Sequence, residues 1–306
     1  MGAAGRRLLA LVPTVVGVAT LVFVLVHLVP GDPVDVMLGE WAAPADVQAL
    51  RHDLGLDRPL LEQYLRFLAR AATGDLGDSI AYRMPVRRVI AARYPATLAL
   101  AGTALGLALV LAIPLGVVAA LRPRSAVDRA ARVLSLAGVC LPTVWLGPLL
   151  ILAFAIGLGW LPVSGAGSVR HLVLPAVTLA LGMIGVLVRL TRASMITALG
   201  EEYVRTARAK GAPAWRVVAV HALRNALLPV TTVVGLQAGA LLAGTIVTET
   251  IFAWPGLGRL VVQAIDARDY PLVQGCVLAI AFTYVAVNAL VDALHRVIDP
   301  RFRHES

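Results

Sequence analysis

The sequence contains few charged side chains and almost no lysine. Only 15% of its 306 residues are charged, and Lys210 is the single lysine among 27 basic residues. A P-loop needs a lysine after glycine and before serine or threonine, so that its ammonium group reaches the phosphates of a nucleotide. Lys210 instead lies between Ala209 and Gly211. The chain therefore cannot itself be a P-loop ATPase.

Cysteine and histidine are also scarce. The two cysteines, Cys140 and Cys276, each lie in an apolar run and provide neither a disulfide framework nor a metal-ligand spacing. The six histidines form no His-Glu-x-x-His pair, and no Gly-x-Ser-x-Gly turn is present. We therefore expect no metal site and no catalytic residues, and an intramembrane enzyme is not favoured.

Apolar sequence is abundant. Hydrophobic residues make up 59% of the chain, and its mean hydropathy is +0.82. A soluble domain is typically about 45–50% apolar, so lipid is the expected solvent for much of this surface. The net charge of +9 could indicate a nucleic-acid partner. Its basic excess lies in short loops between apolar runs, which is instead typical of membrane orientation, and no nucleic acid is expected.

Six apolar runs are long enough, or nearly so, to cross a bilayer, which takes about 20 residues. They are Leu8–Val29, Ala96–Leu121, Val133–Ile156, Leu172–Val188, Asn225–Thr248 and Tyr270–Val291. The first could be a signal peptide, but Pro30-Gly31-Asp32-Pro33 follows it in place of a small-residue cleavage site. The prediction is an all-α integral membrane protein with six transmembrane helices in one domain, residues 1–306.

Basic residues mark one side of this arrangement. Arginines concentrate at the N-terminus, after the second span, after the fourth span and in the C-terminal tail, which all lie on the same side of a six-span chain. The positive-inside rule then places both termini in the cytoplasm. Residues 30–95 form a long outer segment, in which Pro44–Leu56 and Pro59–Ala72 read as short helices. A compact outer cap is expected there.

The segment 189–228 is long, basic and patterned. Glu201–Lys210 suits a short helix, Gly211 ends it, and Pro213 can begin another that carries Trp215. Two short helices joined at Gly211 would offer a rigid projection to a partner protein. The alternative is an interfacial helix whose arginines bind anionic lipid headgroups. The residues alone leave both readings open.

One motif runs from Tyr203 to Gly211 and continues from His221 to Pro229. It resembles the coupling loop of binding-protein-dependent ABC transporter permeases, and more narrowly of their dipeptide, oligopeptide and nickel branch. The family motif has Glu-Ala-Ala, three residues, then Gly; here Arg205-Thr206-Ala207 stands in place of Glu-Ala-Ala, and Gly211 matches. Further matching motifs are Pro30–Pro33, Gly74–Ser79, Glu249–Phe252, Pro255–Gly258, Asp269–Pro271 and Asp299–Arg301.

The resemblance implies a transport subunit of a prokaryotic cell-membrane importer for peptides, which works by alternating access and is driven by separate ATPase subunits. The expected partners are a second, similar permease, two cytoplasmic ATPases that bind ATP and Mg, an external solute-binding protein and membrane lipid. The chain itself would hold no cofactor. Segment 189–228 would dock on the ATPases, with coupling carried by Arg205, Thr206, Ala207, Arg208, Lys210 and Gly211, supported by His221 and Arg224. Nickel or another small solute is the alternative cargo.

An ion-coupled secondary transporter is the main rival class, and a channel is a third. A secondary transporter would need ionisable groups near the middle of the membrane. The candidates are His27, Glu249 and Asp292, and all three lie near span ends. Glu249 could line the outer end of a pathway, or it could pair with Arg259 or Arg268. A channel would want a ring of polar residues within a span, and none stands out.

Overall fold

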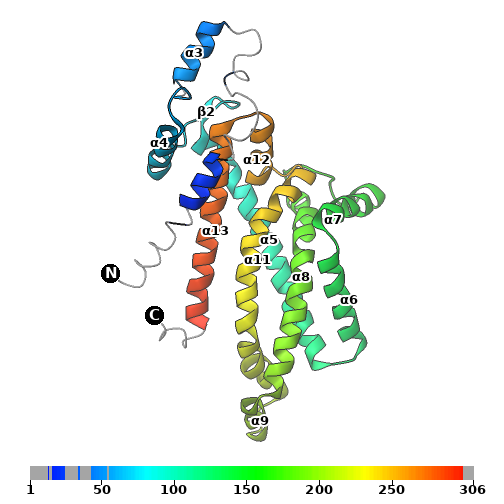
Figure 1. Ribbon diagram of the computed structural model, residues 1–306. Helices are drawn as coiled ribbons and strands as arrows, with labels where there is room; N and C mark the ends of the chain where they lie inside the picture. The colour runs from blue at the N-terminus through cyan, green and yellow to red at the C-terminus, as the bar shows by residue number, and fades with distance from the viewer. Residues whose placement is uncertain (1–12, 14–15, 25–33, 35–42, 54, 299–306) are drawn as a thin grey trace, which may run out of the picture. The chain divides into compact units, whose positions relative to one another are not determined.

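The computed structural model describes residues 13, 16–24, 34, 43–53 and 55–298. In these ranges the regular secondary structure is helical apart from one two-stranded ribbon (Figure 1). It divides into two compact units: residues up to Thr97 together with Pro255–Val285, and Leu98–Trp254 together with residues from Ala286 on. The prediction of one domain stays a prediction, and each unit is described separately.

The first unit contains the segment that the sequence places outside the membrane. Its helices are α3 (Pro44–Asp53) and α4 (Leu60–Thr73), close to the two that were predicted. Gly74 ends α4 in the left-handed conformation, at φ 75°, which glycine adopts without steric cost. The strands β1 (Asp78–Ser79) and β2 (Met84–Pro85) then pair antiparallel.

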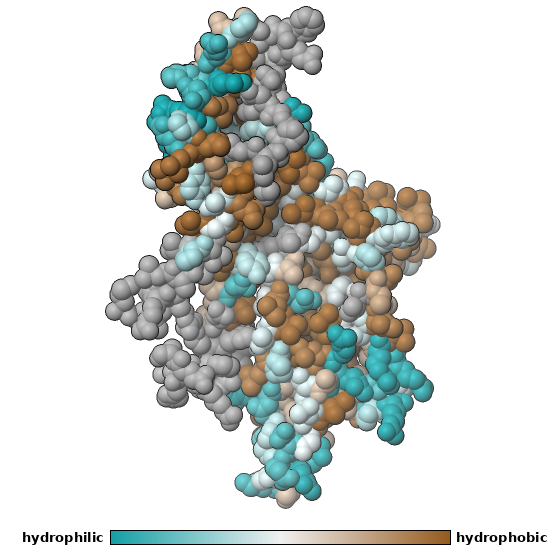
Figure 2. All heavy atoms as spheres, viewed as in Figure 1, coloured by the Kyte–Doolittle hydropathy of each residue, from teal (hydrophilic) through white to brown (hydrophobic). Residues whose placement is uncertain are grey.

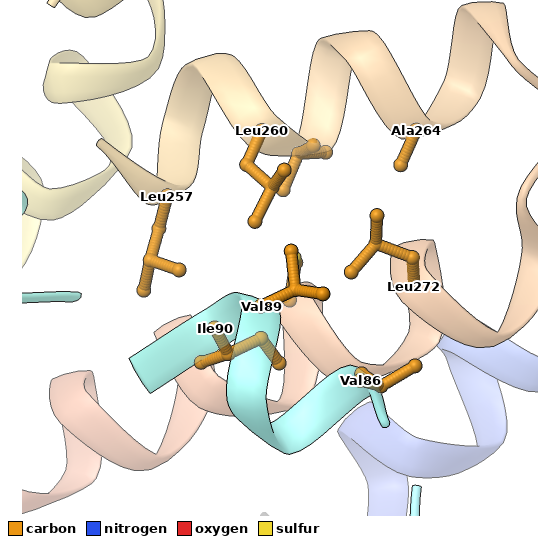
Figure 3. Close-up of a cluster of buried hydrophobic side chains, with 9 residues drawn as sticks. Val86, Val89, Ile90, Leu257, Leu260, Ala264 and Leu272 are labelled. Carbon is orange, nitrogen blue, oxygen red and sulfur yellow. The ribbon is translucent and has the colours of Figure 1, made fainter. Parts of the chain in front are cut away.

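An apolar core joins three helices of this first unit. They are the start of α5 (Val86–Leu121), α12 (Leu257–Asp266) and the start of α13 (Tyr270–Ile298). Figure 3 shows Val86, Val89 and Ile90 of α5 facing the side chains of α12 and α13. The buried residues of this outer core are Val86, Val89, Ile90, Leu257, Leu260, Val261, Ala264, Leu272 and Cys276.

A buried carboxylate fixes the loop beside that core. Asp269 is fully buried and accepts hydrogen bonds from the Ser79 hydroxyl, from the Ala81 amide at 3.0 Å and from the Leu272 amide at 3.1 Å. A buried charged group is tolerated only when its hydrogen bonds are satisfied. Asp269 therefore ties the β1 turn to the start of α13, across 190 residues of sequence.

The second unit is a set of packed helices. After α5 come α6 (Ala126–Cys140), α7 (Thr143–Leu150), the π-helical η1 (Ile151–Gly157), α8 (Val169–Gly200), α9 (Glu202–Ala209), α10 (Ala214–Arg216), the π-helical η2 (Val217–Ala222) and α11 (Leu223–Ile251). Helix α8 packs on both α6 and α11. The α6–α8 contact is close because Gly138 and Gly185 lie at it, and a Cβ on Gly138 would come within 2.5 Å of the Leu181 carbonyl oxygen.

The predicted third span is not one straight helix. Within Val133–Ile156 the chain bends by 107° between α6 and α7. Leu141 is extended and Pro142 precedes the first residue of α7. Proline disfavours helical backbone in the residue before it, which explains a break at this point. Among the described residues four helices are long and apolar enough to cross a membrane, or five if the bent pair counts as one.

Other helix ends differ from the sequence-based limits. Helix α5 begins at Val86, ten residues before the predicted span, and α8 continues to Gly200, past the predicted end at Val188. The predicted spans stopped where charge begins, but an α-helix continues into water when its apolar stripe still packs on a neighbour. The first predicted span lies mostly outside the described residues, and 16–24 of it are helical. Six spans therefore remain a prediction.

Candidate functional site

The segment that carries the main motif folds as a short helical projection, which we call the knob (residues 201–222). Helix α9 (Glu202–Ala209) lies at the lower end of α8 and α11 in Figure 1. Its Val204 is fully buried in a cluster with the end of α5, the end of α8 and the start of α11. The buried members of this knob cluster are Ala120, Met195, Ala198, Val204, Val217, Ala222 and Ala226. The knob is thus anchored on the second unit by small apolar side chains.

Gly211 ends α9 as the sequence predicted. Its φ is 80°, in the left-handed region. Its amide donates to the Arg208 carbonyl at 2.9 Å, and the Ala212 amide donates to the Ala207 carbonyl at 3.1 Å. This pair of bonds is a Schellman motif, which satisfies the last carbonyls of a helix. Ala207 and Ala212 both pack against the knob cluster, so the turn is held by an apolar contact as well.

The remaining motif residues face solvent. Arg205, Thr206, Arg208, Lys210 and Gly211 are exposed, whereas Ala207 is half-buried. Within the described residues, this exposed set has one ion pair, which joins Arg205 to Glu202 at 2.8 Å, and both side chains are well exposed. Such a pair contributes little stability. The basic side chains are therefore available to a partner.

Two aromatic side chains flank this basic surface. Tyr203 is exposed at the start of α9, and Trp215 is 66% exposed on α10. The Arg216 guanidinium lies 5.8 Å from the centre of the Trp215 ring. An exposed tryptophan beside arginines is typical of the residues that dominate protein–protein affinity. Figure 2 shows mainly hydrophilic and near-neutral residues over this lower end of the second unit.

The two supporting residues lie at the base of the knob. His221 is half-buried in η2, and Arg224 is exposed at the start of α11. The His221 carbonyl accepts a hydrogen bond from the Asn225 side chain at 3.0 Å. The structure thus brings six of the eight predicted residues together on α9 and its C-terminal turn. The other two belong to the neighbouring helical run that supports α9.

A buried ion pair near the knob was missed from the sequence. Asp128 of α6 is fully buried and binds Arg192 of α8 through both carboxylate oxygens, at 2.5 and 3.1 Å. It also accepts from the Arg124 amide at 2.9 Å and from Arg132 at 3.1 Å. The pattern Ser125-x-x-Asp128 is typical of a helix start and could have indicated the carboxylate. Nothing in the sequence pairs it with Arg192, because that contact spans 64 residues.

Glu249 is fully buried near the end of α11. Its carbonyl accepts from the Trp254 amide at 2.8 Å, which shapes the turn after the helix. The predicted pairing with Arg259 or Arg268 stays a prediction, as does a pathway role. His27 lies outside the described residues, and nothing is described of the Asp292 side chain.

Comparison with known proteins matches almost the whole chain. Residues 112–304 match the family described as binding-protein-dependent transport system inner membrane component, and residues 4–101 match its N-terminal family. The chain belongs to this family. It is therefore the permease subunit of a bacterial ABC importer, a multi-pass protein of the inner membrane. In this class ATP is bound and hydrolysed by partner ATPase subunits, and the permease carries no cofactor.

Named relatives of the permease fall in the peptide branch. The di/tripeptide transport system permease protein DppB of Pseudomonas aeruginosa (strain UCBPP-PA14) is 44% identical, with 98% of each chain covered. The dipeptide permease DppB of Escherichia coli (strain K12) is 44% identical with the same coverage. The glutathione permease GsiC of the same strain is 42% identical, again over 98% of each chain.

A solved structure shares the fold. The inward-facing MetNI methionine ABC transporter contains a chain that aligns with a TM-score of 0.58 at 16% identity, covering 70% of this chain and 97% of that one. At this identity the likeness supports the permease fold alone.

Proposed function

We propose that this permease imports small peptides, and that its knob docks on a cytoplasmic ATPase subunit. The observation that carries the docking role is the division of the motif: Val204 and Ala207 hold α9, whereas Arg205, Thr206, Arg208 and Lys210 are exposed. Three of these four exposed side chains are basic, so together they form a positively charged helix surface. A rigid, exposed, basic helix suits a cleft in a partner.

The transport cycle follows from a rigid attachment. ATP binding would draw two ATPases together and move the knob with them. Because α9 is joined to α8 at Glu201 and packs on η2, its displacement passes to two long helices at once. The membrane helices would then alternate between inward-open and outward-open states. A second, similar permease and an external solute-binding protein complete the assembly, with six spans and both termini in the cytoplasm.

The peptide assignment draws on the relatives, whose names refer to dipeptides, tripeptides and glutathione. The assembled transporter, reconstituted in vesicles with its binding protein, is offered labelled dipeptide, tripeptide, glutathione and nickel in separate assays. ATP-dependent, vanadate-sensitive uptake of a peptide supports the proposal. Uptake of nickel alone would overturn the peptide assignment and leave the docking role intact.

The docking role has its own test at Gly211. A Cβ there meets no atom within 4 Å, so substitution causes no clash, but a left-handed φ costs most residues about 1 kcal/mol. Gly211→Asp adds a negative charge to the basic surface, and Gly211→Asn is a matched neutral control that also tolerates the left-handed conformation. We expect normal insertion for both, loss of uptake for Gly211→Asp and retained uptake for Gly211→Asn. Near-normal uptake by Gly211→Asp contradicts the coupling role.

A further inference from the structure

A basic pocket opens between α6 and α8 in the second unit. Its volume is about 300 Å³, and its walls are Ala131, Arg132, Ser135, Leu136, Val188, Arg189 and Arg192. The Ser135 hydroxyl donates to the Gly185 carbonyl at one end of it, where the two helices touch. The Asp128–Arg192 ion pair joins the helices at the other end. The pocket thus lies between two contacts that join α6 to α8: the Ser135–Gly185 hydrogen bond and the Asp128–Arg192 ion pair.

The pocket has an excess of positive charge. Arg132, Arg189 and Arg192 line it, and Asp128 is the carboxylate that balances part of their charge. Arg192 forms an ion pair with Asp128. Arg132 binds the same carboxylate, but its own side chain is largely exposed. Arg189 is exposed, and the described part of the chain gives it no ion pair. Two guanidinium groups are therefore free, wholly or in part, to bind an anion.

The rest of the pocket is apolar and continues onto an exposed apolar side of α6. Leu136, one turn beyond Arg132 on α6, is 66% exposed, and Val133, which directly follows Arg132, is 68% exposed. Figure 2 shows the same change, with hydrophilic residues at the lower end of α6 and hydrophobic ones above them. A free phosphate ion would use the arginines alone. A molecule with a phosphate and an attached hydrocarbon chain would use both parts.

We propose that this pocket binds the headgroup of an anionic phospholipid of the phosphatidylglycerol type. The phosphodiester accepts hydrogen bonds from Arg189 and Arg132, since a guanidinium matches phosphate geometry with two parallel N–H groups. One acyl chain lies along Leu136 and Val133. Basic pockets between membrane helices are known to suit such headgroups. The proposal needs this end of the unit to lie at a membrane surface, and it does not depend on the coupling role of the knob.

The test is native mass spectrometry of the assembled transporter, titrated with phosphatidylglycerol and with phosphatidylcholine of identical acyl chains. Each arginine near an anionic headgroup contributes about fivefold in affinity. We expect tighter binding of phosphatidylglycerol, a loss of about fivefold in Arg189→Gln and a larger loss in Arg132→Gln/Arg189→Gln. Arg129→Gln is the matched control, because Arg129 is exposed on the same helix and does not line the pocket.

Four outcomes would overturn the proposal. Equal affinity for the two lipids means that the headgroup charge is not recognised. Equal losses in Arg129→Gln and Arg189→Gln mean that a diffuse surface charge attracts the lipid. Competition by millimolar inorganic phosphate, or binding by the isolated chain that disappears in the assembled transporter, assigns the pocket to a free anion or to a partner chain. ATP-dependent uptake measured on the same variants keeps this result separate from the coupling test.

Discussion

The outer core of the first unit and the knob of the second use the same kinds of residue in opposite ways. Beside the outer core, the motif carboxylate Asp269 is buried and accepts hydrogen bonds from groups of the chain itself. In the knob the motif arginines point outward and have almost no partner within the described chain. Both regions carry family motifs. The comparison separates motif residues that hold the fold from motif residues that present a surface.

The largest expected effect is a loss of stability on removal of the buried carboxylate Asp269. Asp269→Ala leaves the Ser79 hydroxyl and the Ala81 and Leu272 amides without their acceptor. Two of these donors, the Ser79 hydroxyl and the Leu272 amide, belong to buried residues. Unsatisfied buried donors cost about 1–3 kcal/mol each, so we expect a total loss of at least about 2 kcal/mol of unfolding free energy. Thermal unfolding of the purified chain in detergent measures it. Asp266→Ala, which removes an exposed carboxylate from the end of α12, should change little. Similar melting temperatures for the two variants would refute the inward role.

The next effect concerns affinity and leaves stability unchanged. Trp215→Ala removes an exposed ring beside Arg216. If the knob docks on an ATPase, we expect a loss of about 2 kcal/mol in binding, or roughly thirtyfold in Kd. Binding of the isolated ATPase subunit to the permease in nanodiscs measures this. Trp145→Ala on α7 is the control, because Trp145 is 70% exposed and far along the chain from the knob. Equal losses in both variants would argue against the docking surface.

A third effect sharpens the comparison within α9 itself. Val204 is fully buried, whereas its neighbour Tyr203 is exposed. Val204→Ala opens a small cavity in the knob cluster and should lower unfolding free energy by about 1–2 kcal/mol. Tyr203→Ala should leave stability unchanged and lower ATP-stimulated uptake. Melting curves and uptake assays on both variants distinguish the two roles. The same response from both variants would contradict the separation between Val204, which stabilises the knob, and Tyr203, which contacts a partner.

The smallest effect is expected where a charged pair is exposed. Arg70 donates to Asp75 at 3.2 Å, and both side chains are more than half exposed. Exposed ion pairs typically contribute less than 1 kcal/mol, so Arg70→Ala should change unfolding free energy by about 0.5 kcal/mol or less. The melting temperature measures this too. A loss as large as that of Asp269→Ala would mean that burial does not decide which polar contacts matter.

The knob was largely predictable, because its signals are local. A glycine after a run of helix formers indicates a helix end, and Gly211 is that end. The two outer helices begin at or just after the predicted prolines Pro44 and Pro59. Each of these signals acts within a few residues, so the sequence alone carries it.

The remaining features depend on partners that are distant in sequence. Helix α8 continues past Arg189 because its Met195 and Ala198 pack on residues from α5, α9 and α11. From the sequence alone, Arg192 is one of the charges of a basic loop. Its partner Asp128 is identified only in the structure. The bend near Pro142 has a local signal in the proline itself, whereas the length of the apolar run predicts only that Val133–Ile156 can span a membrane. Hydropathy measures whether a segment prefers lipid and does not measure its path.

Helix α8 is longer than the hydrocarbon core of a bilayer is thick. Its 32 residues extend for about 48 Å, and a bilayer core is about 30 Å thick. One end of this rod can therefore stand clear of the hydrocarbon while the other remains within it. A tilt of about 10° around one end moves the other by about 8 Å at this length. A small rotation about one end of α8 would therefore displace its other end by several ångström, about a quarter of the thickness of the hydrocarbon core.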